Sequence, residues 1–122
     1  MVSAAIKPKI IVICGPTGIG KTTVGIRLAE NVGGEIISAD SMQIYRYMDI
    51  GTAKPTADEQ SRISHHMIDV VDPDEDFDAL RFAEMARRKV MQLDHKGVIS
   101  LVVGGTGLYV KALTHGMAPL PP

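Results

Sequence analysis

The sequence is poor in several features that assign a protein to a class at once. It has one cysteine, Cys14, which excludes an intramolecular disulfide framework, fits a reduced compartment and is expected to be a buried core thiol. The 13 Lys and Arg residues are balanced by 14 Asp and Glu residues. The net charge is therefore near zero and gives no sign of a nucleic-acid partner. The N-terminus lacks a signal-peptide core, and no apolar run is long enough to span a bilayer. We therefore expect a soluble, cytoplasmic protein without a membrane partner.

The size and the apolar content are those of one small domain. With 122 residues, of which 45% are hydrophobic, the chain can bury a core but cannot hold a second complete domain. It shows neither an internal repeat nor a low-complexity segment. We expect a single domain over residues 1–122.

Short β-branched runs alternate with segments of helical spacing. The expected strands are Ile10 to Cys14, Glu35 to Ala39 and Val98 to Val103, with His65 to Val71 as a further short strand or extended segment. The expected helices are Lys21 to about Val32 on a Val24, Leu28, Ala29 and Val32 face, Ala79 to about Leu93 after an N-cap at Asp78, and one beginning over Leu108 to Leu113. The apolar face of the second helix is expected to consist of Ala79, Phe82, Ala83, Ala86, Val90 and Leu93. Ser41 to Arg62 should form short helices and loops. The alternation predicts an α/β fold with a parallel sheet.

In such a sheet the carboxyl ends of the strands share one edge. The first strand is expected to be buried on both faces, as parallel strands usually are. The shared edge would bring together Gly15 to Thr22, Asp40 to Gln43 and Gly104 to Gly107. We expect the functional site at this edge.

The first of these segments, GPTGIGKT, is a phosphate-binding loop. It follows a strand and opens a helix, which is the context the motif requires. Backbone N–H groups and the helix N-terminus would face an anion, Lys21 would add a charge, and the Thr22 hydroxyl could ligate Mg²⁺. The residues expected to hold phosphate are Gly15, Pro16, Thr17, Gly18, Ile19, Gly20, Lys21 and Thr22.

The companion carboxylate of nucleotide-hydrolysing enzymes is missing. In those enzymes a later buried strand ends in an Asp that supports the metal, whereas here the strand ending at Val103 runs into Gly104 and Gly105. The carboxylate that follows a strand is Asp40. It could be a turn former or a helix N-cap. Its expected place opposite the phosphate loop also fits a general base that takes a proton from a nucleophile.

Four motifs together resemble the tRNA dimethylallyltransferase family, also called tRNA isopentenyltransferases. They are GPTGIGKT, SADSMQIYRYMDIGTAKP (Ser38 to Pro55), HHMIDVVDPDEDFD (His65 to Asp78) and LVVGGTGLYVKAL (Leu101 to Leu113). The resemblance extends from about Ile10 to Pro122. It implies a three-layer fold like that of the P-loop NTPases, incomplete here relative to the family.

The resemblance also implies the chemistry. The loop would hold the diphosphate of dimethylallyl diphosphate together with Mg²⁺, and the prenyl group would move to the exocyclic amine of an adenosine beside the tRNA anticodon. The implied catalytic residues are Asp40 as the base, Lys21 and Thr106. The implied tRNA contacts are Asp40, Ser41, Met42, Gln43 and Thr106, and Thr22 is the implied metal ligand. An adenine must leave its stack to reach such a pocket.

Family members are considerably longer, and the part that grips the anticodon stem and supplies a diphosphate-binding arginine is expected to be absent here. We therefore expect the chain alone to bind diphosphate weakly and to transfer little or no prenyl group. Full-length family members are expected to be monomers. Two alternatives remain: a P-loop small-molecule kinase that uses ATP, and a non-catalytic phosphate-binding module.

Other side chains have ordinary interpretations. His65 and His66 fit loop hydrogen bonding better than a metal site, because adjacent imidazoles point differently. Asp72 to Asp78 fits a solvated loop with a helix cap better than a calcium loop. The basic residues Arg81, Arg87, Arg88 and Lys89 fit a solvated helix face better than an RNA contact. Met42 and Met48 fit a prenyl pocket and core filling equally well.

Overall fold

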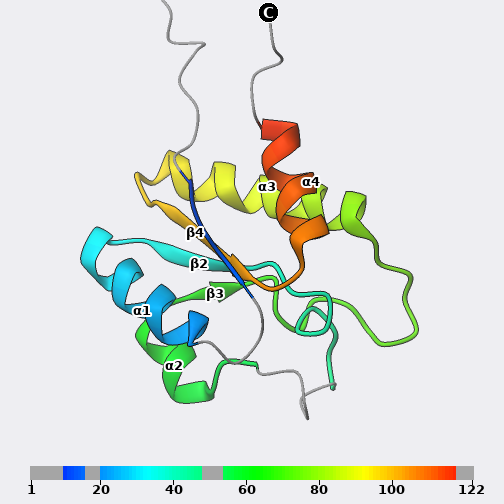
Figure 1. Ribbon diagram of the computed structural model, residues 1–122, viewed down its shortest axis with the longest axis horizontal. Helices are drawn as coiled ribbons and strands as arrows, with labels where there is room; N and C mark the ends of the chain where they lie inside the picture. Colours follow the sequence, from blue (N-terminus) through cyan, green and yellow to red (C-terminus); the bar gives the residue numbers. More distant parts are fainter. Residues whose placement is uncertain (1–9, 16–19, 48–53, 118–122) are drawn as a thin grey trace, which may run out of the picture.

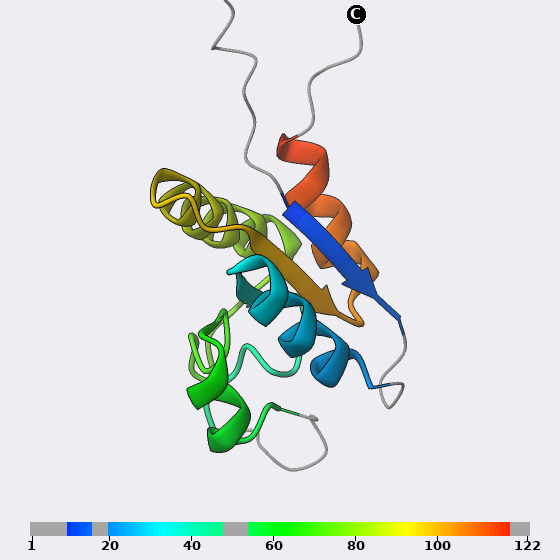
Figure 2. The same ribbon diagram turned by 90° about the vertical axis from the view of Figure 1, so that its left-hand side faces the viewer.

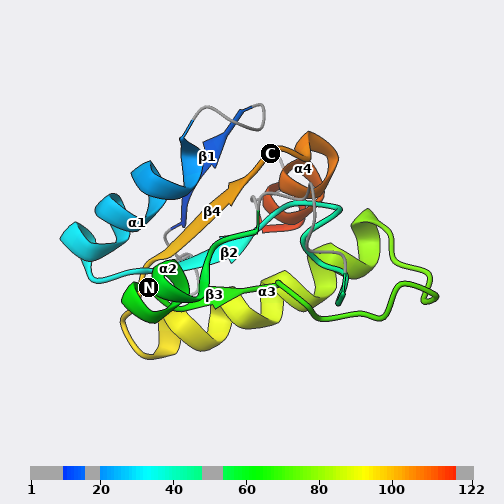
Figure 3. The same ribbon diagram turned by 90° about the horizontal axis from the view of Figure 1, so that it is seen from below.

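The computed structural model describes residues 10–15, 20–47 and 54–117. Their centre is a parallel sheet of four strands in the order β1-β4-β2-β3 (Figure 3). The strands are β1 (Ile10–Cys14), β2 (Glu35–Ser38), β3 (His65–His66) and β4 (Ser100–Gly104). Met48 and four residues expected in the phosphate loop, Pro16 to Ile19, lie outside the described residues. The predicted α/β class and parallel sheet are confirmed.

Helices cover both faces of the sheet and make a three-layer structure (Figures 1 and 2). One face carries α1 (Lys21–Val32), with the short α2 (Ala57–Arg62) beside it. The other face carries α3 (Ala79–His95) and α4 (Gly107–Met117), which pack on each other. Two apolar clusters fill the spaces between the layers, one under α1 and a larger one under α3 and α4. No helix of the described residues combines the length and the apolar character that crossing a membrane requires.

Helix α1 has the predicted extent, but only part of its predicted face packs on the sheet. Val24 and Val32 are 54% and 37% exposed, while Gly25, Ile26 and Ala29 are buried. A Cβ on Gly25 would lie only 3.1 Å from a side-chain methyl of Val103. The predicted face is confirmed at Ala29 and Leu28 and wrong at Val24 and Val32. The helix approaches the sheet through Gly25, and a search for apolar spacing does not count a glycine.

Helix α3 confirms its predicted cap and its predicted face. The Asp78 carboxylate accepts a hydrogen bond from the Arg81 backbone N–H at 2.8 Å. The buried side chains of the helix are Phe82, Ala83, Ala86, Val90 and Leu93. Phe82 stacks on Tyr109 of α4 with ring centroids 4.6 Å apart. This contact joins the two helices of the larger cluster.

Strand β1 is less buried than its apolar sequence suggests. Ile11 and Ile13 pack toward α1, whereas Val12 is 41% exposed and Cys14 is an exposed free thiol. Alternate residues of a strand point to opposite faces, and in the described part β1 has a strand neighbour on one side only. The expectation of a strand buried on both faces with a core cysteine was therefore wrong.

The segment after β3 is a turn rather than a longer strand. Only His65 and His66 pair with β2, and then Met67 and Asp69 adopt left-handed backbone angles, with φ of 67° and 56°. Such angles end an extended chain. Val71 returns to form an isolated bridge with Tyr45. The expected strand from His65 to Val71 is thus corrected to two residues followed by a structured turn.

The acidic loop and the basic side chains of α3 have local partners. Asp72 and Glu75 bond to each other's backbone N–H groups, and the Arg81 guanidinium donates to the Asp76 carbonyl oxygen at 2.7 Å while lying over the Phe77 ring. Arg87 donates to the Ala112 carbonyl oxygen of α4 at 3.4 Å. The arginines Arg81 and Arg87 therefore hold the fold together in addition to facing solvent.

Candidate functional site

The ends of three strands meet at one edge of the sheet, as the sequence predicts. The Ala39 N–H donates to the Val103 carbonyl at 2.9 Å, and the Thr106 N–H donates to the Ala39 carbonyl at 3.2 Å. The Gly15 N–H donates to the Gly104 carbonyl at 3.4 Å. A Cβ on Gly104 would lie 2.1 Å from the Ala39 carbonyl oxygen, so this approach of β4 to β2 requires glycine. Backbone contacts alone thus bring the three motif segments together.

A cavity of about 170 Å³ opens between these segments. It lies between the start of α1 and the chain that leaves β2. Its lining residues in the described chain are Gly20, Lys21, Thr22, Ser38, Asp40, Gln43, Pro55, His65, Val103 and Gly104. Gly20, Lys21 and Thr22 of the predicted phosphate loop therefore share one cavity with Asp40, which is the juxtaposition that the sequence predicts.

The first wall of the cavity is the N-terminus of α1. Gly20 is the N-cap residue and adopts a left-handed φ of 78°, an angle that favours glycine. The Val24 N–H bonds to the Gly20 carbonyl at 3.1 Å, so the first turn of α1 follows Gly20 directly and starts at the cavity. Lys21 and Thr22 add an ammonium and a hydroxyl to this wall. We call this part, Gly20 to Thr22, the anion wall.

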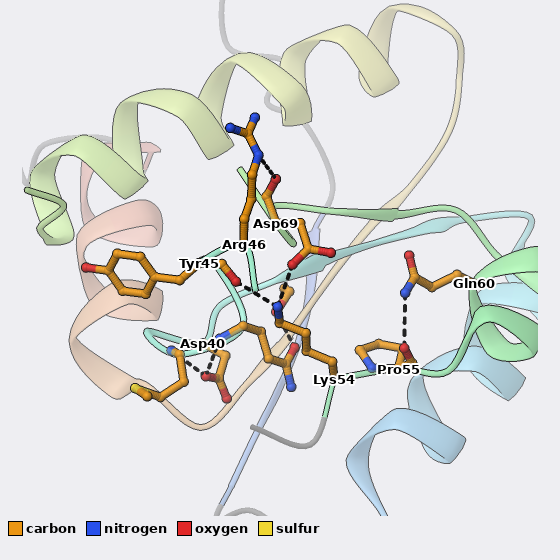
Figure 4. Close-up of polar contacts among 10 residues, drawn as sticks. Asp40, Tyr45, Arg46, Lys54, Pro55, Gln60 and Asp69 are labelled. Atoms are coloured by element: carbon orange, nitrogen blue, oxygen red, sulfur yellow. Dashed lines mark hydrogen bonds and ion pairs between the residues drawn. The ribbon is translucent and has the colours of Figure 1, made fainter. Parts of the chain in front are cut away.

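The second wall is the turn that follows β2, with Asp40 at its start. Asp40 Oδ1 accepts two backbone hydrogen bonds, from Met42 N at 2.8 Å and from Gln43 N at 3.1 Å (Figure 4). Asp40 Oδ2 has no hydrogen-bond partner within the described residues. Asp40 is thus a turn former through one oxygen and has its other oxygen available beside the cavity. We call Ser38 to Arg46 the polar turn.

Gln43 is fixed at the side chain and at the backbone. The Ser38 hydroxyl, which is 3% exposed, donates to Gln43 Oε1 at 2.8 Å. The Gln43 carbonyl accepts the Asp69 N–H at 3.1 Å. These bonds determine the orientation of a side chain that lines the cavity, so the amide is positioned before any ligand binds.

Four other described residues that were predicted to be in the site, Gly15, Ser41, Met42 and Thr106, are not in the cavity lining. Thr106 Oγ1 accepts the Ser41 N–H at 2.9 Å and lies 3.4 Å from the Ser41 hydroxyl oxygen. Met42 is 44% exposed. Thr106 therefore joins the β4 loop to the start of the polar turn, and it stands one contact away from Asp40.

The two histidines form local hydrogen bonds, which confirms their predicted role. His66 Nε2 lies 2.7 Å from Glu35 Oε1, and His65 Nδ1 lies 2.8 Å from the Ile63 carbonyl oxygen. His65 Nε2 is buried without a partner in the described chain. Burial lowers the pKa of His65 below its usual value of about 6.5, which outweighs the opposing effects of the Ile63 carbonyl and the Glu59 charge. The imidazole is therefore neutral at pH 7, with Nδ1–H donating to Ile63.

An aromatic hydroxyl lies near the polar turn. Burial raises the pKa of Tyr109, and the negative charges of Asp78 and Asp40 act in the same direction. Tyr109 therefore stays protonated at neutral pH and contributes no charge near Asp40.

Sequence reasoning missed several residues of the cavity. Ser38, Pro55, His65 and Val103 line it but were not predicted as site residues. The signal for Ser38 was available, because alternation along β2 puts it two residues before Asp40 on the face opposite Ile37. Pro55 and His65 reach the cavity only through the tertiary fold, and no local pattern marks them.

Comparisons with known proteins identify the family. A family model described as IPP transferase matches residues 43–122. The tRNA dimethylallyltransferase of Desulfosudis oleivorans is 62% identical over 111 residues, covering 91% of this chain and 35% of that protein. The tRNA dimethylallyltransferase 2 of Syntrophus aciditrophicus is 59% identical, with coverages of 91% and 36%.

Solved structures agree with the sequence matches. The full-length tRNA isopentenylpyrophosphate transferase of Bacillus halodurans superimposes with a TM-score of 0.87 at 46% identity, covering 95% of this chain and 38% of that one. A eukaryotic dimethylallyltransferase solved while acting on tRNA gives a TM-score of 0.81 at 38% identity, with coverages of 86% and 26%. The fold is thus the P-loop NTPase-like fold of these enzymes, and the chain spans about a third of the length of the curated relatives it matches. The chain belongs to the IPP transferase family.

Proposed function

We propose that this chain is the diphosphate-binding and base-carrying part of a tRNA dimethylallyltransferase. The observation that carries the proposal is the single cavity lined by Lys21 and Thr22 on one side and by Asp40 and Gln43 on the other. Relatives that share this part of the chain are named for the transfer of a dimethylallyl group and for tRNA. The proposed substrates are dimethylallyl diphosphate and an adenosine beside the tRNA anticodon.

The anion wall suits a leaving diphosphate. When an allylic carbon–oxygen bond breaks, its electron pair leaves with the diphosphate, and negative charge grows on the departing oxygens. The N–H groups at the start of α1 and the Lys21 ammonium stabilise that charge where it develops. The Thr22 hydroxyl is an oxygen donor beside the same cavity, as Mg²⁺ prefers, and Thr22 would hold this ion together with diphosphate oxygens. Bound there, Mg²⁺ would neutralise part of the leaving-group charge.

The polar turn suits the nucleophile. The lone pair of the adenine amine is delocalised into the ring, so the amine attacks carbon only as it loses a proton. The new carbon–nitrogen bond forms while that proton passes to Asp40 Oδ2, the oxygen that no backbone N–H occupies. Gln43 lines the cavity with an oriented amide, a group able to hydrogen-bond a purine edge. Ser41, Met42 and Thr106 would contact the tRNA from beside the cavity.

The size of the cavity supports weak function of the chain alone. Its volume of about 170 Å³ is below the roughly 300–1,000 Å³ of complete small-molecule sites. A diphosphate, a five-carbon chain and a purine together need more room and more contacts than these residues supply. We infer that the site is completed by the part of the relatives that this chain does not span.

The test needs an extended chain, defined as this chain joined to the part of the D. oleivorans relative that follows the matched region. With radiolabelled dimethylallyl diphosphate and an anticodon stem-loop RNA, the extended chain should put label into the RNA in a Mg²⁺-dependent reaction. With γ-labelled ATP as donor it should transfer no phosphate. Phosphate transfer without prenyl transfer would show that the chain is part of a kinase. If neither reaction occurs, the chain is a non-catalytic phosphate-binding module.

A second measurement uses the 122-residue chain alone. Titration with inorganic diphosphate should show weak binding that falls by about tenfold or more in Lys21→Met, because a charge-assisted hydrogen bond contributes about 1.5–3 kcal/mol. Equal binding by both proteins would mean that the anion wall does not hold diphosphate.

A further inference from the structure

Two motif segments that the proposed chemistry does not use meet behind the polar turn. Lys54 precedes Pro55 at the end of one motif, and Asp69 closes the HHMID stretch of the other. The Lys54 ammonium donates to the Tyr45 carbonyl oxygen at 2.7 Å and forms an ion pair with Asp69 Oδ1 (Figure 4). Only 9% of the Lys54 side chain is exposed. A lysine this buried is held by its partners, because burial of a charge without them is costly.

Asp69 is bonded at its backbone as well as at its carboxylate. Its N–H donates to the Gln43 carbonyl at 3.1 Å, and its carbonyl accepts from Arg46 Nε at 3.1 Å. Its φ of 56° is a left-handed angle that persists in a non-glycine residue only where surrounding contacts impose it. Asp69 therefore joins the ammonium of Lys54 to the backbone of Gln43.

The polar turn is thus fixed from two sides. On the cavity side, Asp40 Oδ1 holds two backbone N–H groups of the turn and Thr106 holds a third. On the far side, Lys54 and Asp69 hold the carbonyls of Tyr45 and Gln43. The cavity-side bonds reach no further than Gln43. The second half of the turn is held by the Lys54 bond to the Tyr45 carbonyl and by backbone bonds that join Ile44 and Arg46 to the segment after Asp69.

We propose that Lys54, through its ion pair with Asp69, is a positioning residue for the reaction. It touches neither substrate. It holds the polar turn so that the Gln43 amide and the Asp40 carboxylate face the cavity together. The inference rests on the proposed function for its catalytic consequence, while its structural part concerns the turn itself.

The variant that tests this is Lys54→Met, which keeps the aliphatic stem and removes the ammonium. In the extended chain, kcat/KM for the RNA should fall by about ten- to a hundredfold, because small misplacements of reacting groups lower reaction rates by factors of this size. In the 122-residue chain, binding of inorganic diphosphate should stay within about twofold, because the anion wall is built from α1 and not from the turn. A residue that only stabilises the whole fold would change both measurements or neither.

Two further variants give the controls. Arg62→Met breaks the exposed 2.8 Å ion pair with Glu30 between α2 and α1, and it should change neither measurement. Asp69→Asn keeps the shape but removes the other charge of the pair, so it should reproduce the RNA defect and tests the proposal even if Lys54→Met does not fold. The double variant with Lys54→Met and Asp69→Asn should lower kcat/KM for the RNA no more than either single change does. Lys54→Arg should restore part of the lost activity.

Backbone amide exchange separates the positioning role of Lys54 from the proposed function of the chain. In the 122-residue chain, Lys54→Met should speed exchange at the N–H groups of Asp69 and Val70 relative to the unaltered chain. Unaltered exchange together with unaltered RNA kinetics would overturn the positioning role. If Lys54→Met speeds exchange but the unaltered extended chain transfers no prenyl group, Lys54 still holds the polar turn, and the proposed function is overturned instead.

Discussion

The two walls of the cavity are built in different ways. The anion wall consists of consecutive residues, Gly20 to Thr22, at the start of one helix, and a single motif specifies all of it. The polar turn is held by bonds to residues distant in the sequence, including Thr106, which is 65 positions from Ser41, and Asp69, which bonds the Gln43 carbonyl. The residues proposed to bind phosphate are therefore placed by local sequence, whereas the turn that carries Asp40, the proposed base, depends on contacts between distant segments.

The largest expected effect comes from a substitution that removes the proposed base of the polar turn and keeps the turn folded. In the extended chain, Asp40→Asn should lower kcat by about 10²- to 10⁴-fold, the usual contribution of a general base. An asparagine oxygen can still accept the Met42 and Gln43 N–H groups, so the turn should remain. Single-turnover prenyl transfer measures the effect, and diphosphate binding by the short chain is the control. Retained activity would reduce Asp40 to a turn former.

The sequence predicted the anion wall and the meeting of three strand ends, because both follow from local motifs and from the common direction of parallel strands. It also predicted α3, where the Asp78 cap and five buried apolar residues repeat at helical spacing. These features depend on neighbours within a few positions along the chain.

The remaining features depend on tertiary contacts. Gly25 lets α1 approach Val103, which turns Val24 outward against its apolar character. The left-handed φ at Met67 breaks a segment whose composition is that of a strand. Lys54 becomes a buried partner of Asp69 although an isolated lysine predicts a solvent-exposed side chain. None of these outcomes has a local signal, so the far side of the polar turn could not be predicted.

The next effect tests whether the polar turn depends on the close approach of two strands. Gly104→Ala would put a Cβ 2.1 Å from the Ala39 carbonyl oxygen, which is backbone and cannot move aside alone. The free energy of unfolding should fall by about 1–3 kcal/mol, as for other overpacked sites. Gly107→Ala is the matched control, since no atom lies within 4 Å of its added Cβ and the residue begins α4. Urea unfolding measures both, and equal stabilities would show that the two strand ends separate easily.

A smaller effect is expected from the loss of one hydrogen bond in the polar turn, the bond between Ser38 and Gln43. Ser38→Ala removes the 2.8 Å bond to Gln43 Oε1 and leaves the backbone bonds of Gln43 in place. A net hydrogen bond contributes about 0.5–1.5 kcal/mol, so KM for the RNA should rise about two- to tenfold in the extended chain. Diphosphate binding by the short chain should not change. A loss of diphosphate binding would mean that Ser38 belongs to the anion wall.

The smallest effect concerns pH and the histidine that lines the cavity. Because burial lowers the pKa of His65 in the folded chain, the unfolded chain binds more protons as the pH falls below about 6.5. Stability is therefore greatest above that value and declines toward pH 5, with His65→Gln removing part of the decline. His66→Gln breaks the neighbouring pair with Glu35, and His95→Gln alters an exposed histidine at the end of α3. If the slope of the unfolding free energy against pH is unchanged in His65→Gln, His65 is not the source of the decline. A response confined to His65→Gln identifies His65, a residue that tertiary contacts bring into the cavity lining, as the acid-sensitive group.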